Sequence, residues 1–318
     1  MKTNKFLIGF LLQAVVCSGG LHAQTDLHAN AYSIIQDAVT DIVCTSPTDA
    51  IQKEKRVIQI LDGKGKGDAS FVCMCDRFSS LKKFSGEVRD ASGNVIRKIK
   101  KSELKVTEYS DELVSDDYYY FFEYTPSRYP ITITYEWEIK NSDGLIGYPS
   151  FLPQKNYNQS VAQASYRILT PADNPCRYRT INMQAEVSQQ QTADGNWLTE
   201  VKVQSLPAIQ KEPYSPALSE LLPRIYFTPR NFSFEGTKGS MDNWQTYGAW
   251  QYQLLNGRDQ IPPALKEELQ RRTANCNTPY EKIAAVYQYL ASTTRYVSIQ
   301  LGIGGLQPIA ATDVHRTG

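Results

Sequence analysis

Cysteine and histidine are the side chains with which this sequence is best equipped for nucleophilic or metal chemistry. The 318 residues include six cysteines and three histidines. Beyond the apolar first 23 residues, the histidines are His28 and His315 and the cysteines are Cys44, Cys73, Cys75, Cys176 and Cys276. No two cysteines have the spacing of a zinc knuckle or a redox Cys-x-x-Cys pair, and too few soft ligands exist to complete four positions. The sequence therefore predicts no metal site and no cofactor.

Motifs for covalent or phosphate chemistry fail as well. Neither histidine has a neighbouring serine or cysteine pattern that would suggest a triad, and no Gly-x-Ser-x-Gly elbow occurs. The glycine-rich segments 63–67 and 236–240 lack the Walker spacing, and 302–307 lacks the last glycine of a dinucleotide fingerprint. We expect the first two to be flexible surface turns and the third to be a loop. No catalytic, cofactor-binding or metal-binding residue is assigned from these patterns.

The cysteines are expected to be structural. Five cysteines follow residue 23, an odd number, so at least one of these thiols has no partner among them. Cys73 and Cys75 flank Met74 in an apolar run, so on a strand they share a face and both can be core residues. A direct bridge between them would be strained, and pairing of one of them with Cys44 is the more plausible disulfide.

The first residues have the pattern of a targeting segment. Lys2 and Lys5 precede the apolar run 6–17, and Leu21-His22-Ala23 is a small-residue cleavage pattern. This predicts a signal peptide over 1–23, cleavage near Ala23, and export to the periplasm or cell envelope. A lipid anchor on Cys17 is the alternative, but Val16 stands where that processing expects a small residue.

Composition excludes several classes of protein. With 34 basic and 33 acidic residues, the net charge of +1 gives no field that would hold a nucleic acid. Hydrophobic residues make up 41% and charged residues 21%, an ordinary globular balance. The apolar runs are shorter than the roughly 20 residues of a membrane-spanning helix. We expect neither a nucleic-acid partner nor a membrane span.

Residues 32–234 have the pattern of strands and turns. The segment 130–139 alternates strictly, with Ile131, Ile133 and Tyr135 on one face and threonines and glutamates on the other. Further runs rich in β-branched and aromatic residues are 57–61, 84–88, 118–124, 164–169 and 197–203. Segments 91–94 and 193–196 are typical of hairpin turns, and the basic run 97–101 of a charged strand edge. The pattern favours a mainly β fold, an antiparallel β-sandwich over 24–235.

The pattern changes after a proline-rich stretch. Five prolines within 205–230 predict an extended chain that interrupts helix and sheet alike, and we place a domain junction near 236–242. Thr278-Pro279-Tyr280-Glu281 is a capping box with proline at the first helical position, which predicts a helix over 279–294. A shorter helix is expected over 263–273. Residues 236–318 are too few for a typical domain of roughly 100–150 residues, so a second domain is expected to be incomplete.

Two parts of the sequence resemble a known arrangement in exported bacterial proteins. Lys55-Arg56-Val57-Ile58-Gln59-Ile60-Leu61 and the segment 86–96 are similar to early strands of the domain-of-unknown-function family 3857. The segment 278–290 with Thr294-Arg295-Tyr296-Val297-Ser298-Ile299 resembles the start of a transglutaminase-like domain. The resemblance implies a β-rich module followed by an α+β, papain-like domain that is represented by its N-terminal helices.

The same resemblance implies where a catalytic centre would stand. In that family a Tyr-Gly-Asp-Cys-Lys motif carries the nucleophile, followed by His and Asp, and the segment 313–318 stands where this motif is expected to start. Cys276 and His315 precede the motif, so neither occupies a catalytic position of the family. We therefore expect no catalytic triad in the chain as given.

Three functions remain open. The first is an exported, non-catalytic β-module ahead of a truncated transglutaminase-like domain, without activity of its own. The second is a fragment of a Cys-His-Asp protease or transglutaminase-like amidase that acts on protein or peptide amide bonds. The third is binding of an envelope glycan or protein through aromatic side chains, for which core packing is the favoured alternative. The aromatic residues concerned are the run 118–122 and Trp137, Trp197, Trp244 and Trp250.

Overall fold

A computed structural model describes residues 25–108, 114–296 and 299–318. The predicted signal peptide, 1–23, lies outside the described residues. Strands account for 42% and helices for 22% of the structure, which confirms a mainly β fold with helices toward the C-terminus. Within the described part of the chain, no helix is long and apolar enough to cross a membrane.

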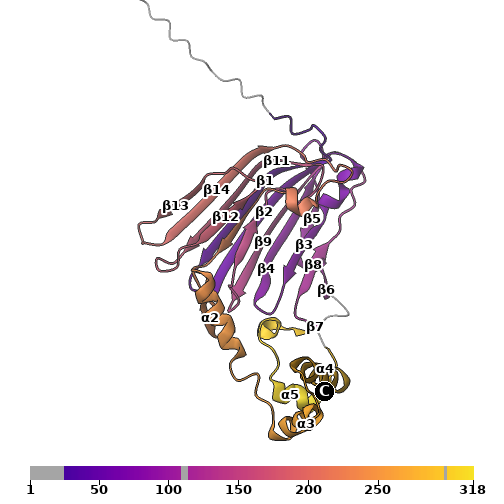
Figure 1. Ribbon diagram of the computed structural model, residues 1–318. Coiled ribbons are helices and arrows are strands. Elements are labelled where there is room, and N and C mark those ends of the chain that lie inside the picture. Colours follow the sequence, from indigo (N-terminus) through magenta and orange to yellow (C-terminus); the bar gives the residue numbers. More distant parts are fainter. Residues whose placement is uncertain (1–24, 109–113, 297–298) are drawn as a thin grey trace, which may run out of the picture.

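The body of the molecule is an eight-stranded sheet in the order β13-β14-β11-β1-β2-β9-β4-β5 (Figure 1). The strands are β1 (Ser33–Cys44), β2 (Asp49–Ile60), β4 (Ser79–Arg89), β5 (Val95–Lys100), β9 (Ile131–Ser142), β11 (Gln159–Thr170), β13 (Val187–Gln191) and β14 (Trp197–Leu206). All neighbouring pairs are antiparallel except β1 and β11, which run parallel. The sheet is therefore mixed, and the prediction of a purely antiparallel arrangement was wrong at this pair.

Two three-stranded sheets pack against this large sheet. One contains β10 (Tyr148–Phe151), β15 (Arg224–Thr228) and β12 (Arg177–Ile181), and the other β3 (Phe71–Cys75), β8 (Tyr118–Phe122) and β6 (Lys105–Glu108). The first contributes Phe151 and Phe227 to a core cluster with β1, β11 and β14. The second contributes Phe71 to a cluster with β4 and β9. We call these the first and the second core cluster.

Both clusters lie on the same face of the large sheet. Ile42 of the first cluster pairs across the sheet with Gln52, which pairs with Ile139 of the second. Residues directly opposite each other on neighbouring strands point to the same side. The inner face is thus covered by two separate small sheets, with β2 running between the two clusters.

Several local predictions are confirmed. In β9 the side chains of Ile131, Ile133 and Tyr135 are buried while their neighbours are not. Both predicted hairpin turns occur, with Gly93 at φ +85° and Gly195 at φ +80°, in the left-handed region that favours glycine. The basic run 97–101 contributes to β5, an outer strand of the large sheet, where charge discourages pairing with another chain.

Three local predictions were wrong. Segment 236–240 is not a flexible turn, because Thr237–Ser240 forms a strand that pairs with Asn231–Phe234. Strand β15 lies inside the proline-rich stretch and forms the centre of its small sheet, because Pro223 and Pro229 flank the strand and remove no hydrogen-bond donor within it. Segment 63–67 belongs to a 3₁₀ helix, Gly63–Ala69, and is not a flexible turn. Gly65 is buried there, and a Cβ at this position would lie 2.3 Å from the Tyr32 carbonyl oxygen.

The helices gather at one end of the large sheet (Figure 1). They are α2 (Trp244–Leu255), α3 (Pro263–Thr273), α4 (Pro279–Thr293) and α5 (Ala311–Thr317), with a short α1 (Leu218–Leu221) earlier in the chain. The predicted helices correspond to α3 and α4, whereas α2 was not predicted. The remaining elements are the 3₁₀ turns Lys101–Glu103 and Gly302–Gly305, β16 (Asn231–Phe234), β17 (Thr237–Ser240), β7 (Val114–Ser115) and β18 (Ile299–Gln300).

Two connections join the helical segment to the body. Strands β16 and β17 form a hairpin on which Trp250 of α2 packs, its ring 4.9 Å from that of Phe232. Later in the chain β18 pairs in parallel with β7, and the Gly302 amide donates to Asp116 Oδ2 at 3.1 Å. Arg77 pairs with Glu235 at 2.9 Å beside this second connection. The helical segment is therefore attached at both its beginning and its later part.

Candidate functional site

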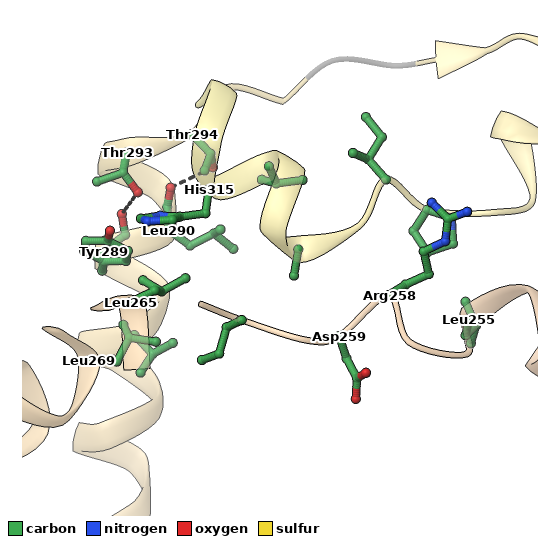
Figure 2. A pocket seen from close by; sticks show the side chains of 16 residues that line it. Leu255, Arg258, Asp259, Leu265, Leu269, Tyr289, Leu290, Thr293, Thr294 and His315 are labelled. Carbon is green, nitrogen blue, oxygen red and sulfur yellow. Dashed lines mark hydrogen bonds between the residues drawn. The ribbon is translucent and has the colours of Figure 1, made fainter. Parts of the chain in front are cut away.

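The helical segment contains an apolar groove of about 760 Å³. Sixteen residues from α2 through α5 line it, and most are aliphatic. Figure 2 shows Leu265 and Leu269 of α3 on one side, with Tyr289 and Leu290 of α4 nearby. The other lining residues are Leu255, Arg258, Asp259, Ile261, Val286, Thr293, Thr294, Pro308, Ile309, Ala311, Val314 and His315.

Local sequence signals place α4 along this groove. The Thr278 hydroxyl accepts a hydrogen bond from the Glu281 amide at 3.2 Å, and Glu281 accepts one from the Thr278 amide at 3.3 Å. This reciprocal cap satisfies amides that have no partner within the helix. From that start, Val286 and Leu290 fall four residues apart and line the groove together.

The polar side chains of the groove are few. The Thr293 hydroxyl donates to the Tyr289 carbonyl at 2.7 Å, and the Thr294 hydroxyl to the Leu290 carbonyl at 2.8 Å. Both hydroxyls are thus engaged with their own helix. His315 projects from α5, and no cysteine or serine is among the sixteen lining residues. The groove can hold apolar side chains, and its described lining contains no thiol for acyl transfer.

The structure places the five described cysteines in three locations, and none forms a disulfide there. Cys44 and Cys176 belong to the first core cluster, and Cys73 and Cys75 to the second. The expected core position of Cys73 and Cys75 is confirmed, but Cys44 lies with Cys176, so its predicted pairing with either of them was wrong. Cys276 is half-buried between α3 and α4, outside the groove.

Burial makes two of these thiols poor nucleophiles. Loss of hydration raises the pKa of Cys44 to about 11 and the pKa of Cys176 to about 12. Because the thiolate is the reactive form, both side chains are protonated and inert at neutral pH. Among the described residues, no group of three or more His, Cys, Asp or Glu side chains could hold a metal ion.

Of the aromatic residues considered for glycan binding, several pack in the interior and Trp244 lies on the surface. Trp137 and the side chains of Tyr118, Tyr120 and Phe122 pack against the second core cluster, and Trp250 is buried. Trp244 is 84% exposed. It lines an open groove of about 740 Å³ with Tyr178 and Tyr226. The sequence indicated Trp244 but not the two tyrosines, because they come from separate strands, β12 and β15, that only the fold brings to the start of α2.

A protein-family model for a domain of unknown function with a solved structure, DUF3857, matches residues 50–210, about half of the chain. The chain belongs to the DUF3857 family. The family match covers most of the sheet body, without β1 and β15, and does not reach the helical segment, so the resemblance of that segment to a transglutaminase-like domain has no such support. A search of curated proteins finds no match to the sequence.

Solved structures extend the comparison to the fold of the DUF3857 chain. A crystal structure of "a putative protease" from Parabacteroides distasonis matches with a TM-score of 0.60 at 12% identity. The match covers 87% of this chain and 53% of that protein. An M1 zinc metallopeptidase from Deinococcus radiodurans matches with a TM-score of only 0.30 at 8% identity, over 77% and 53% of the two chains. The chain spans about half the length of these solved structures.

Proposed function

We propose that this chain is an exported, non-catalytic part of a peptide-bond-cleaving or amide-transferring enzyme. In this proposal the DUF3857 body is a rigid platform, and the helical segment is the start of a transglutaminase-like domain. Further polypeptide supplies the Cys-His-Asp centre. The mature chain begins near Gln24 and acts in the periplasm or cell envelope.

The observation that carries the proposal is the uncovered apolar surface of α4, beside the groove between α3, α4 and α5. Helix α4 has no buried residue, and its Tyr280, Ile283 and Tyr287 are 80%, 68% and 69% exposed. A helix with this much uncovered apolar surface is typical of one that packs against another layer. A catalytic layer placed there would cover this surface and draw its orientation from the body.

The comparison with the protein from Parabacteroides distasonis supports the same arrangement. Its fold follows most of this chain, yet nearly half of its length lies outside the match. We take that additional portion as the counterpart of the polypeptide that would complete the helical segment. Its description as a protease suggests peptide amides as the substrate class.

The test is an activity assay on the purified chain and on the product of its complete gene. The chain alone is expected to release no product from fluorogenic peptides or casein. The complete product is expected to act and to lose its activity when the cysteine of its Tyr-Gly-Asp-Cys-Lys motif becomes alanine. Activity of the chain alone that survives replacement of all five mature cysteines would refute the proposal, as would a complete product without such a motif.

Binding of an envelope glycan is a second candidate, favoured by the exposed groove at Trp244. An indole that is 84% exposed beside Tyr178 and Tyr226 offers a surface on which sugar rings can stack. Glycan-array binding is expected to disappear in Trp244→Ala and to persist in Tyr214→Ala, a control at a fully exposed tyrosine outside the groove. Equal binding by both variants would exclude this groove.

A further inference from the structure

Strand β2 carries a strip of polar side chains on the inner face of the large sheet. Gln52, Glu54 and Arg56 alternate along the strand and share the face of Ala50 and Ile58, which belong to the two core clusters. Charged groups are seldom placed between apolar clusters, because removing them from water costs free energy. Their position at the boundary between the two small sheets therefore needs an explanation.

A cavity of about 260 Å³ lies above this strip. Thr40 of β1 and Glu54 and Arg56 of β2 line it from the large sheet. Phe151 at the end of β10 and Lys155 shortly after it line the other side. Because a water molecule occupies roughly 30 Å³ in the liquid, the cavity has room for several waters or one small organic group. It is distinct from the apolar groove of the helical segment.

The cavity has an excess of positive charge. Glu54 Oε2 lies 3.6 Å from Arg56 Nη2 in an ion pair. The other carboxylate oxygen, Oε1, accepts a hydrogen bond from the side-chain amide of Gln52. Lys155 adds a second cation, so the three ionised side chains sum to one net positive charge. In the described part of the chain, Arg56 Nε is buried and has no hydrogen-bond partner. A buried cationic donor without a partner is costly, so further negative charge near this guanidinium would be stabilising.

The surroundings also disfavour the charged form of Lys155. Its side chain is solvent-exposed, but crowding by protein atoms and the charge of Arg56 lower its pKa to about 8, against the opposite effects of Glu54 and Cys73. An anion bound between the two cations would favour the ammonium form. Lys155 therefore offers a reporter of occupancy that can be reached from solvent.

We propose that this cavity binds a small monocarboxylate, held by Arg56 and Lys155. Arg56 and Lys155 line the cavity from its two sides, so that each can donate a charge-assisted hydrogen bond to a carboxylate oxygen. One net positive charge balances a monoanion but not a phosphate dianion. The carboxylate belongs either to a free organic acid or to the C-terminus of a peptide. This site is independent of the function proposed for the helical segment.

The experiment measures protection of Lys155 from acetylation at pH 8 by mass spectrometry of the purified protein. The probes are acetate, N-acetyl-trialanine, the amide of that tripeptide and inorganic phosphate. At ten times its dissociation constant a bound carboxylate is expected to slow the reaction of Lys155 about elevenfold. The exposed Lys238 of β17 is the internal control and is expected to react at an unchanged rate.

The outcomes separate the two sources of the carboxylate. Protection by acetate alone indicates a free acid, and stronger protection by the tripeptide than by its amide indicates a peptide end. Absence of protection by either carboxylate up to its solubility limit overturns the proposal. Protection by phosphate alone, or equally by the amide, also overturns it.

Variants test the two cations separately. Arg56→Gln is expected to abolish protection of Lys155, whereas Arg167→Gln, in an ion pair with Glu200 outside the cavity, is expected to keep it. If Arg56→Gln does not fold, Lys155→Met replaces it, because that side chain is exposed. Calorimetric titration of Lys155→Met is expected to show about tenfold weaker binding of the carboxylate, and unchanged affinity would contradict its assigned role.

Discussion

The sheet body and the helical segment differ in how they bury their apolar side chains. In the body, two small sheets cover the inner face of the large one, and Tyr166 is fully buried with its ring stacked 4.3 Å from that of Phe227. In the helical segment, α3 buries only Leu265 and α4 buries no residue. The body thus obtains its stability from its own residues, whereas the helices depend mainly on local signals and on their two connections to the body.

This difference predicts unequal responses to the loss of a large aromatic side chain. Phe227→Ala removes a buried ring from the first core cluster and is expected to lower the free energy of unfolding by about 3–5 kcal/mol. Tyr287→Ala, at an exposed position of α4, is expected to change it by less than about 0.5 kcal/mol. Urea denaturation followed by fluorescence measures both. Comparable losses in the two variants would show that α4 is as tightly packed as the body.

The contact between α2 and the β16–β17 hairpin sharpens the comparison at the boundary between the regions. Trp250 is 2% exposed, and its indole donates to the Thr237 hydroxyl at 3.1 Å. Trp250→Ala is expected to lower the free energy of unfolding by about 3 kcal/mol, because it removes the largest side chain of a small buried cluster.

Hydrogen exchange locates the effect of Trp250→Ala. Amides of α2, β16 and β17 are expected to lose protection while those of β9 keep it. Trp244→Ala, an exposed tryptophan on the same helix, serves as the matched control and is expected to leave all of them unchanged. Loss of protection throughout β9 would mean that the two regions unfold as one unit.

How well the sequence predicted each element follows from the range of the interactions that determine it. The alternation in β9 and the capping box of α4 are local signals, and both elements appeared as expected. The parallel pairing of β1 with β11 was not predictable, because alternation assigns a face but does not identify a neighbour. Helix α2 was missed because its buried positions, Trp250 and Leu254, give only a short apolar pattern.

The carboxylate site was missed for a related reason. The residue pattern predicted a strand over 57–61, and the family resemblance extended it to Lys55, whereas β2 begins at Asp49 and includes the polar positions Gln52 and Glu54. A strand with charged residues on its inward face contradicts the usual pattern of a half-buried strand. Extending the predicted strand toward its N-terminus as far as Gln52 would have indicated the charged strip. It would not have indicated Lys155, which the fold brings from about 100 positions further along the chain.

Helix α4 provides a test of local stabilisation. Thr278→Ala removes the hydroxyl that caps the first turn and is expected to destabilise the helix by about 1 kcal/mol. The measurement is hydrogen exchange of the α4 amides, which are expected to exchange several times faster while those of β9 do not change. Thr294→Ala at the other end of the helix is the control. Its hydroxyl bonds a carbonyl rather than an orphan amide, so the N-terminal amides are expected to keep their protection.

Lys155, at the cavity above β2, gives the stability of the body a pH dependence. Lys155 has a pKa of about 8 in the folded protein against 10.5 as its ordinary value. Between these values the unfolded chain binds more protons than the folded one, so this side chain makes the folded state more stable as the pH rises from about 8 to about 10.5. Below pH 8 its charged form opposes folding to the full extent.

Thermal denaturation of the wild type and of Lys155→Met between pH 7 and 10.5 isolates the contribution of Lys155 to stability. The buried tyrosines and thiols titrate in both proteins and cancel in the difference. The difference in stability between them is expected to favour the variant at pH 7 and to shrink as the pH approaches 10.5. Lys238→Met is the matched control and is expected to show no such trend. A constant difference across the range would mean that Lys155 is fully hydrated, and the cavity would then offer an anion a single cation, Arg56, already paired with Glu54.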